Sequence, residues 1–364
     1  MQKLKRLLGA LIVLMCLSAC SNLKPQPPAA LPDYGEPARE EKGVRRFTVL
    51  AEQLRVPWSI DFAEDSFYIS EREGTIVQVE DGKITRQPVN TAKAVKAVGE
   101  GGLLGMVLTP NFSATGQAYA YHTYDNNGET NNRVILIQRK REGWEEVKSF
   151  IEGIPGSNVH NGGRMAIGPD QHLYITTGDA GNGELAQAES SLGGKILRMK
   201  LDGTVPEDNP ASGSYVYSTG HRNAQGLAWN DAGQLYNSEH GPSGTPGGHD
   251  EINHIEAGND YGWPGIIGDQ AGKGLTRPAY HTGERTIAPS GIAFDENGHL
   301  LIAGLRGEAL YRLDVENQSM VEVLAGEGRI RDVKILEGKV YIITNNTDGR
   351  GKPSEKDDRL LLLE

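Results

Sequence analysis

One histidine and several basic or amide side chains stand beside glycine-rich turns, where one apolar segment gives way to the next. The set comprises His160, Arg222, Asn223, Arg306, Arg329 and Arg331. Grouped arginines repel one another unless an anion lies between them, and their planar guanidinium groups bind carboxylates through paired hydrogen bonds. If folding brings these residues together, they form a basic site for a polycarboxylate or a phosphate.

Taken singly, an arginine at such a position more often bonds neighbouring carbonyl groups than a ligand, and a single histidine is structural about as often as an arginine. Their positions in a repeat favour a shared site. One phrase occurs six times: an apolar strand, a turn rich in Asp, Asn, Gly or Pro, and a second strand. The second strands centre on Tyr68, Tyr119, Tyr174, Tyr236, Leu301 and Tyr341. The basic residues precede the first strand or follow the second, and these points meet at one end of a radial fold.

The mean spacing of these phrases, roughly 55 residues, suits a four-stranded blade with its loops. The sequence therefore predicts an all-β chain, a six-bladed β-propeller of four-stranded antiparallel blades. Residues 47–54 are expected to form the outer strand of the last blade beside residues 359–363, which closes the ring without an open edge. A two-sheet β-sandwich or several small β-domains are the alternatives, but no internal linker separates the phrases.

The N-terminus has the pattern of a bacterial export signal. A basic start precedes a short apolar run that ends in Leu17-Ser18-Ala19-Cys20, which predicts a lipoprotein signal over residues 1–19 and acylation of Cys20. An ordinary signal peptide is the alternative. Residues 20–45 are rich in proline and are expected to form a tether, with the folded domain over residues 46–364. We expect a protein held by its lipid at the outer face of the cytoplasmic membrane, in the periplasm or at the outer membrane.

Charge and cysteine content exclude several classes of function. The chain carries 37 basic and 48 acidic residues, for a net charge of -11, which disfavours nucleic-acid binding through a basic face. Of its two cysteines, Cys16 lies in the signal and Cys20 would be blocked by lipid, so no disulfide, zinc-finger or thiol chemistry is expected. No pattern specifies an oligomeric state.

From about residue 46 to its end, the chain resembles the aldose sugar dehydrogenases that use pyrroloquinoline quinone (PQQ). The segments that carry the resemblance are GGLLG (101–105), HNGGR (160–164), TTGDAG (176–181), LGGKILR (192–198), GHRNAQGLAW (220–229), EHGP (239–242), DEIN (250–253), NDYGWP (259–264), IAPSG (287–291) and RIRD (329–332). Any one of them is weak evidence, but together they are specific.

The resemblance implies a role for each basic residue. His160 corresponds to the general base that removes the proton of the sugar's C1 hydroxyl while hydride passes to the quinone, and an imidazole suits this role near neutral pH. Arg222 corresponds to the residue that faces the quinone oxygen, and Asn223 to its hydrogen-bonding neighbour. Arg329 and Arg331 match the pair that holds the cofactor carboxylates. Arg306 stands where the family usually has a lysine.

The resemblance also implies calcium. The backbone carbonyls of Gly241 and Pro242 match ligands of a calcium ion that bridges protein and cofactor, since calcium accepts backbone oxygens readily. Glu251 and Tyr261 match positions that bind a second, structural calcium in some relatives. Asp179, in the TTGDAG segment, and Glu184, where one branch has a substrate-contacting glutamine, are candidate substrate residues.

Several positions depart from the family pattern. Glu100 stands where relatives carry a glutamine against the cofactor, Val159 replaces a carboxylate beside the base, and the stretch between Pro242 and Asp250 is longer than usual. The resemblance implies oxidation of aldoses at C1 to lactones, with electrons passed to an external acceptor. A non-catalytic propeller that binds an anionic ligand or a surface partner, and a metal-dependent lactonase-like hydrolase, are the alternatives.

Overall fold

The structure, a computed structural model, describes residues 38–39, 46–244 and 247–364. The predicted signal peptide, Cys20 and most of the predicted tether lie outside the described residues. Within the tether, β1 (Ala38–Arg39) pairs in parallel with Val321 and Glu322. No helix in the described part of the chain is long and apolar enough to cross a membrane.

The described domain is built from β-sheets, with helices of only four residues at α1 (Phe112–Thr115) and α2 (Glu184–Gln187). The largest sheet has the order β3 (Pro57–Ala63), β4 (Ser66–Glu71), β5 (Thr75–Glu80), β6 (Lys83–Asn90), β10 (Trp144–Pro155), β9 (Glu129–Arg139), β8 (Gln117–Asn126) and β7 (Leu103–Leu108). Its two halves are antiparallel meanders, and they join through two parallel residue pairs between β6 and β10.

The other sheets contain four or five strands each. One comprises β11 (Met165–Ile167), β12 (His172–Thr176), β13 (Ile196–Lys200) and β14 (Val216–Ser218), and the next β15 (Ala224–Trp229), β16 (Leu235–Glu239), β17 (Glu251–Ile255) and β18 (Tyr280–His281). A third comprises β1, β22 (Ser319–Ala325), β21 (Ala309–Asp314), β20 (Leu300–Gly304) and β19 (Pro289–Phe294). The last comprises β2 (Phe47–Ala51), β25 (Leu360–Leu363), β24 (Lys339–Thr344) and β23 (Ile330–Leu336).

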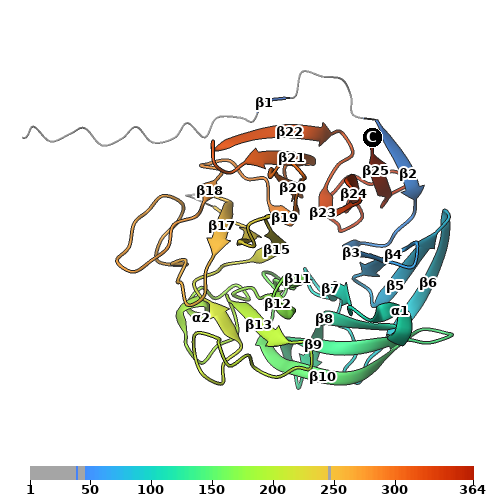
Figure 1. Ribbon diagram of the computed structural model, residues 1–364, viewed down its shortest axis with the longest axis horizontal. Helices are drawn as coiled ribbons and strands as arrows, with labels where there is room; N and C mark the ends of the chain where they lie inside the picture. Colours follow the sequence, from blue (N-terminus) through green and yellow to red (C-terminus); the bar gives the residue numbers. More distant parts are fainter. Residues whose placement is uncertain (1–37, 40–45, 245–246) are drawn as a thin grey trace, which may run out of the picture. The chain divides into compact units, whose positions relative to one another are not determined.

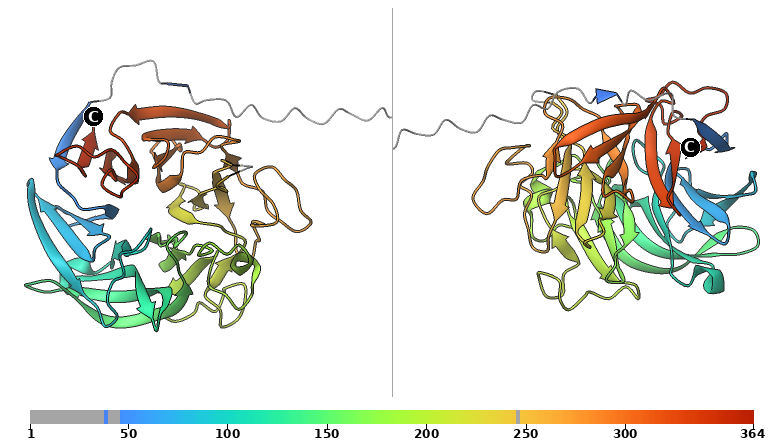
Figure 2. Two further views of the ribbon diagram at one scale, coloured as in Figure 1. Left: turned by 180° about the vertical axis from the view of Figure 1, so that it is seen from behind. Right: turned by 45° about the horizontal axis from the view of Figure 1, so that its top comes forward.

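These sheets stand radially around a common axis, which defines a β-propeller (Figure 1, Figure 2). Each inner strand packs against the next, in the cycle β3, β7, β11, β15, β19, β23 and back to β3. Strand β2 lies antiparallel to β25, with Phe47 opposite Leu363. It is shorter than the predicted strand 47–54, because Gln53 has a positive φ of 59° and turns the chain.

The six repeated phrases correspond to pairs of neighbouring antiparallel strands: β3/β4, β7/β8, β11/β12, β15/β16, β19/β20 and β23/β24. The centres of the second strands are all buried, from Tyr68 in β4 to Tyr341 in β24. Local sequence explains the turns as well. Asp81 and Gly82, both with positive φ, join β5 to β6 in the conformation that a two-residue hairpin requires.

Candidate active site

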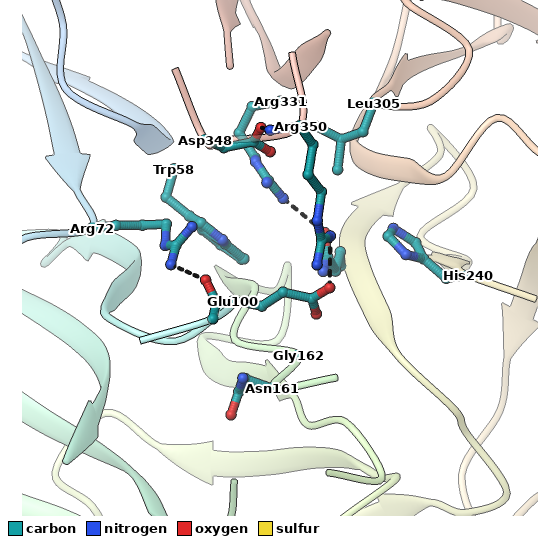
Figure 3. A pocket seen from close by; sticks show the side chains of 12 residues that line it. Trp58, Arg72, Glu100, Asn161, Gly162, His240, Leu305, Arg331, Asp348 and Arg350 are labelled. Atoms are coloured by element: carbon teal, nitrogen blue, oxygen red, sulfur yellow. Dashed lines mark hydrogen bonds and ion pairs between the residues drawn. The ribbon is translucent and has the colours of Figure 1, made fainter. Parts of the chain in front are cut away.

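The loops that enter the inner strands and leave the second strands meet at one end of the axis around two adjoining cavities. The outer cavity has a volume of about 780 Å³, and the inner cavity one of about 30 Å³. The predicted residues that line the outer cavity are Glu100, Val159, His160, Arg222, Gly241, Pro242, Arg306 and Arg329. Arg331 lines the inner cavity, which Figure 3 shows from close by. The structure therefore brings the predicted imidazole and arginines together.

His160 is held so that one ring nitrogen points to a buried carboxylate. Its Nδ1 lies 2.7 Å from Asp179 Oδ1, and Nε2 has no hydrogen bond to any described residue. Because the carboxylate accepts a hydrogen bond from Nδ1–H, the neutral ring has its lone pair on Nε2. The side chain is about one-fifth exposed. This arrangement leaves Nε2 available as a base in the outer cavity.

The backbone of His160 is also unusual. Its φ of 54° lies in the left-handed region, which a non-glycine residue adopts only when its surroundings enforce it. Its N–H donates to Glu100 Oε2 at 2.8 Å, and its carbonyl accepts from Ala180 N–H at 3.1 Å. The strained conformation is thus fixed by contacts from two other loops, which aim the ring at Asp179.

Asp179 lies on the Nδ1 side of His160, and both of its carboxylate oxygens accept hydrogen bonds. Besides His160, Oδ1 accepts the Gly181 N–H at 2.7 Å, and Oδ2 accepts the indole N–H of Trp263 at 2.8 Å. The residue is 1 % exposed and lines neither cavity. Asp179 was a candidate substrate residue; its carboxylate contacts the ring of His160 in this structure.

Arg222 and Asn223 lie in the turn that enters β15. The Arg222 guanidinium donates to the His240 carbonyl at 3.2 Å and lies 5.4 Å from the ring centre of Trp263. Burial lowers the pKa of Arg222 from its usual value, and nearby carboxylates such as Asp179 offset part of this effect. Asn223 Oδ1 accepts the Gly162 N–H, but its Nδ2 is buried without a partner among the described residues.

Arg329 and Arg331 differ in their partners. Arg329 donates twice to Asp348 Oδ2, at 3.2 and 2.8 Å. Arg331 instead donates to the neutral groups Gln225 Oε1 (2.9 Å) and Ser290 Oγ (3.4 Å), and its Nε is buried without a partner among the described residues. Burial, together with neighbouring arginines, lowers the pKa of Arg331 to about 9 despite the opposing effect of Asp348. An anion would satisfy both the charge and the free N–H of Arg331.

Arg306 and Glu184 are both exposed side chains. Arg306 is exposed on the turn after β20, and its guanidinium has no hydrogen bond or ion pair with the described residues. Glu184 is exposed in the first turn of α2 and lines neither cavity. The two differ in access to the mouth, since only Arg306 borders the outer cavity.

The carboxylate of Glu100 has two partners. Oε2 accepts the His160 N–H, and Oε1 lies 2.8 Å from a guanidinium nitrogen of Arg350. Burial alone would raise its pKa, but the hydrogen bond from His160 and the charge of Arg350 hold the pKa below its usual value. Glu100 is therefore ionised at neutral pH, directly beside the cavity.

The predicted calcium positions form two separate groups. Gly241 and Pro242 line the outer cavity, and neither carbonyl accepts a hydrogen bond from any described residue. Glu251 is half-buried at the start of β17, where desolvation and then repulsion by Glu239 raise its pKa to about 8. The Tyr261 hydroxyl is bonded to the His254 carbonyl. Among the described residues, no group of three or more His, Cys, Asp or Glu side chains is placed to hold a metal ion.

Sequence reasoning missed several residues of the site. These are Trp58, Arg72, Asn161, Gln225, His240, Asp348 and Arg350, which line the inner cavity. The repeat contained a signal for two of them, since Arg72 and His240 each stand four residues after a phrase centre, Tyr68 and Tyr236. Arg350 follows no such rule, because it lies in the irregular loop between β24 and β25.

Fold and site together define a β-propeller with an arginine-rich pair of cavities at one end of its axis and an accessible imidazole in the outer one. A family profile described as Glucose / Sorbosone dehydrogenase matches residues 54–361. The chain therefore belongs to the glucose/sorbosone dehydrogenase family.

Individual relatives agree with this assignment. The chain is 35 % identical to quinoprotein glucose dehydrogenase B of Acinetobacter calcoaceticus over 214 residues, which covers 50 % of this chain but only 44 % of the relative. It is 29 % identical to the aldose sugar dehydrogenase YliI of Escherichia coli over 83 % of this chain and 90 % of the relative.

A solved structure is more similar still. The PQQ-bound aldose sugar dehydrogenase of Streptomyces coelicolor superposes with a TM-score of 0.81 at 38 % identity, over 90 % of this chain and 99 % of the other. The two proteins are therefore alike in sequence as well as in fold.

Proposed function

We propose that this protein oxidises the C1 hydroxyl of aldose sugars to lactones, with PQQ as cofactor and an external electron acceptor. The observation that carries the proposal is the placement of His160, with Nε2 free of any bond to described residues, in one cavity with four arginines. The family and the PQQ-bound relative support the choice of cofactor. The repeats and the cycle of inner strands favour six blades, with β2 closing the ring.

The residues present fit PQQ, which is a planar tricarboxylic acid. The buried N–H groups of Arg331 and Asn223 and the buried Nε2 of His240 lack partners among the described residues, and the two N–H groups are placed to donate to the cofactor's oxygens. Arg329, Arg306 and Arg222 add positive charge around the outer cavity. An apolar or cationic ligand would leave these groups unsatisfied, which is costly when they are buried.

The chain's own residues account for the movement of the proton. His160 Nε2 accepts the proton of the sugar's C1 hydroxyl, and the carboxylate of Asp179 stabilises the imidazolium that results. Bound PQQ supplies the acceptor for the hydride that leaves C1. Arg222 stabilises the negative charge that develops in the mouth, the role of preorganised donors in many active sites. Trp263 orients the carboxylate of Asp179 by donating its indole N–H to Oδ2.

The direct test is a titration of calcium-loaded apoprotein with PQQ, followed by absorbance and by reduction of an artificial acceptor in the presence of aldoses. We expect saturable binding and sugar-dependent reduction. Binding without reduction for any aldose would favour a non-catalytic propeller that holds an anion. Absence of binding would refute the choice of cofactor.

Substitution of Asp179 by asparagine tests the orientation of the base. Asparagine keeps the size of the side chain but removes the charge that stabilises the imidazolium, so kcat is expected to fall about 10²- to 10⁴-fold. PQQ affinity and the KM for sugar should change little, because Asp179 lines neither cavity. Steady-state kinetics at saturating PQQ measures both. A large rise in KM with unchanged kcat would instead support direct contact with the substrate.

We also propose that calcium binds at the carbonyls of Gly241 and Pro242, and a second calcium beside Glu251. Chelation of the holoprotein should lower the melting temperature by on the order of 5 °C, since a ligand bound only by the native state stabilises it. PQQ affinity should fall as well. The melting temperature is measured by calorimetry with and without chelator, and magnesium serves as the control metal. If neither melting nor PQQ affinity responds, both assignments are wrong.

For the part of the chain outside the described residues, we propose export and acylation of Cys20. The sequence Leu17-Ser18-Ala19-Cys20 supports this proposal. It would leave the propeller tethered to a membrane by lipid alone.

A further inference from the structure

The ion pair between Glu100 and Arg350, which Figure 3 shows at the inner cavity, is formed by two residues that line both the inner and the outer cavity. Glu100 comes from the loop before β7 and Arg350 from the loop after β24, so the pair links segments that are far apart in the sequence. Four residues line both cavities: Glu100, His240, Leu305 and Arg350. The ion pair is therefore part of the partition that separates the small inner cavity from the mouth.

Two arginines that line the inner cavity have no hydrogen bond to a carboxylate among the residues that the structure describes. Arg331 donates only to neutral side chains, and Arg72 donates to the backbone carbonyls of Gly99 and Gly101. Asp348, which also lines the inner cavity, is already bonded to Arg329 and Asn345. The inner cavity thus attracts a carboxylate, yet its volume of about 30 Å³ is too small to admit more than a water-sized group.

The two partners of the ion pair differ in mobility. Glu100 is fixed, because its second oxygen accepts the His160 N–H. Arg350 has its backbone N–H anchored on Asp348 Oδ1 at 2.9 Å, but its side chain is 55 % exposed. An ion pair with a solvated partner contributes little to stability, and exposed side chains change rotamer rapidly. The Arg350 side chain can therefore leave the ion pair at a small cost in free energy.

We propose that Arg350 is a further binding residue for the anionic ligand, and that the Glu100–Arg350 ion pair closes the inner cavity until a ligand carboxylate replaces Glu100 on Arg350. With PQQ as the ligand, the inference rests on the proposed function. The charge of Glu100 then competes with the ligand for Arg350. The ion pair also explains how a carboxylate is tolerated where relatives carry a glutamine, because Arg350 neutralises the charge of Glu100.

The test compares binding to calcium-loaded apoprotein of wild type, Glu100→Gln and Arg350→Gln. Two probes are used, PQQ and benzene-1,3,5-tricarboxylate, and calorimetry measures Kd. Glutamine at position 100 retains an acceptor for the His160 N–H but releases Arg350, so Kd should fall on the order of five- to tenfold. Arg350→Gln removes the ligand's partner and leaves Glu100 uncompensated, so Kd should rise by at least as much.

Arg277→Gln is the matched control, because it removes one exposed positive charge from a residue that lines neither cavity. Its Kd should equal that of wild type. If PQQ binds with the same Kd in both site variants, the exchange is refuted while the proposed function stands. If only the tricarboxylate binds, with the opposite shifts described, the exchange stands and the cofactor assignment fails. If neither probe binds any variant, both are refuted.

Discussion

Replacement of His160 by alanine is expected to lower turnover about 10²- to 10⁴-fold, the usual contribution of a general base. The reason is geometric. His160 Nε2 has no bond to any described residue, whereas Nδ1 is held by Asp179 at 2.7 Å, so the ring is oriented to accept a proton from the cavity. Turnover at saturating PQQ and sugar is the measurement.

PQQ affinity should be nearly unchanged in His160→Ala, because the imidazole offers no charge-paired contact to a carboxylate. A titration followed by absorbance tests this separation of binding from chemistry. Because His160→Ala leaves no imidazolium for Asp179 to stabilise, Asp179→Asn in the same background should add little. Near wild-type turnover in His160→Ala would refute the mechanism even if the cofactor assignment is right.

Replacement of Arg331 by alanine is expected to weaken PQQ binding by about 2–5 kcal/mol, which is roughly 30-fold to a few thousand-fold in Kd. Arg331 is buried, and within the described part of the chain its Nε has no partner and its other N–H groups donate only to neutral groups. In this setting a bidentate bond to a carboxylate is strong, since little solvent screens it. Excess PQQ should restore part of the rate, in contrast to His160→Ala.

The apoprotein of an Arg331 variant provides the control. Burial lowers the pKa of Arg331 to about 9, which means that the folded state disfavours the charged form, and the cost is present below that pH. Arg331→Met keeps the volume of the side chain and removes the charge, so the ligand-free variant should melt no lower than wild type. A sharp loss of stability in Arg331→Met would show that Arg331 serves the fold rather than the ligand.

Much of the fold follows from local sequence. The six phrases contain their own strand and turn chemistry, and each becomes an antiparallel pair with a buried centre such as Tyr68 or Leu301. Because inner strands of a radial fold share one direction, the residues that precede them meet at one end of the axis. This is why His160 and Arg222 could be assigned to one mouth without coordinates.

Contacts between loops could not be read in the same way. The pairs His160 with Asp179 and Glu100 with Arg350 join segments 19 and 250 residues apart, and they depend on loop conformations that no periodic pattern encodes. The left-handed backbone of His160 and the irregular loop that carries Arg350 are examples. Glu184 shows the converse, since a suitable position in the sequence left its side chain outside both cavities.

The sequence thus determined the kind of fold and the side chains that crowd one end of it, because strand periodicity and turn chemistry are local properties. The tertiary structure decided which of these charges are paired. Arg329 has Asp348 and Glu100 has Arg350, but Arg331 keeps an N–H without a partner among the described residues. Pairing depends on distances of a few ångströms between loops, within one sheet for Arg329 and Asp348 and between two sheets for Glu100 and Arg350, and those distances exist only in the folded chain.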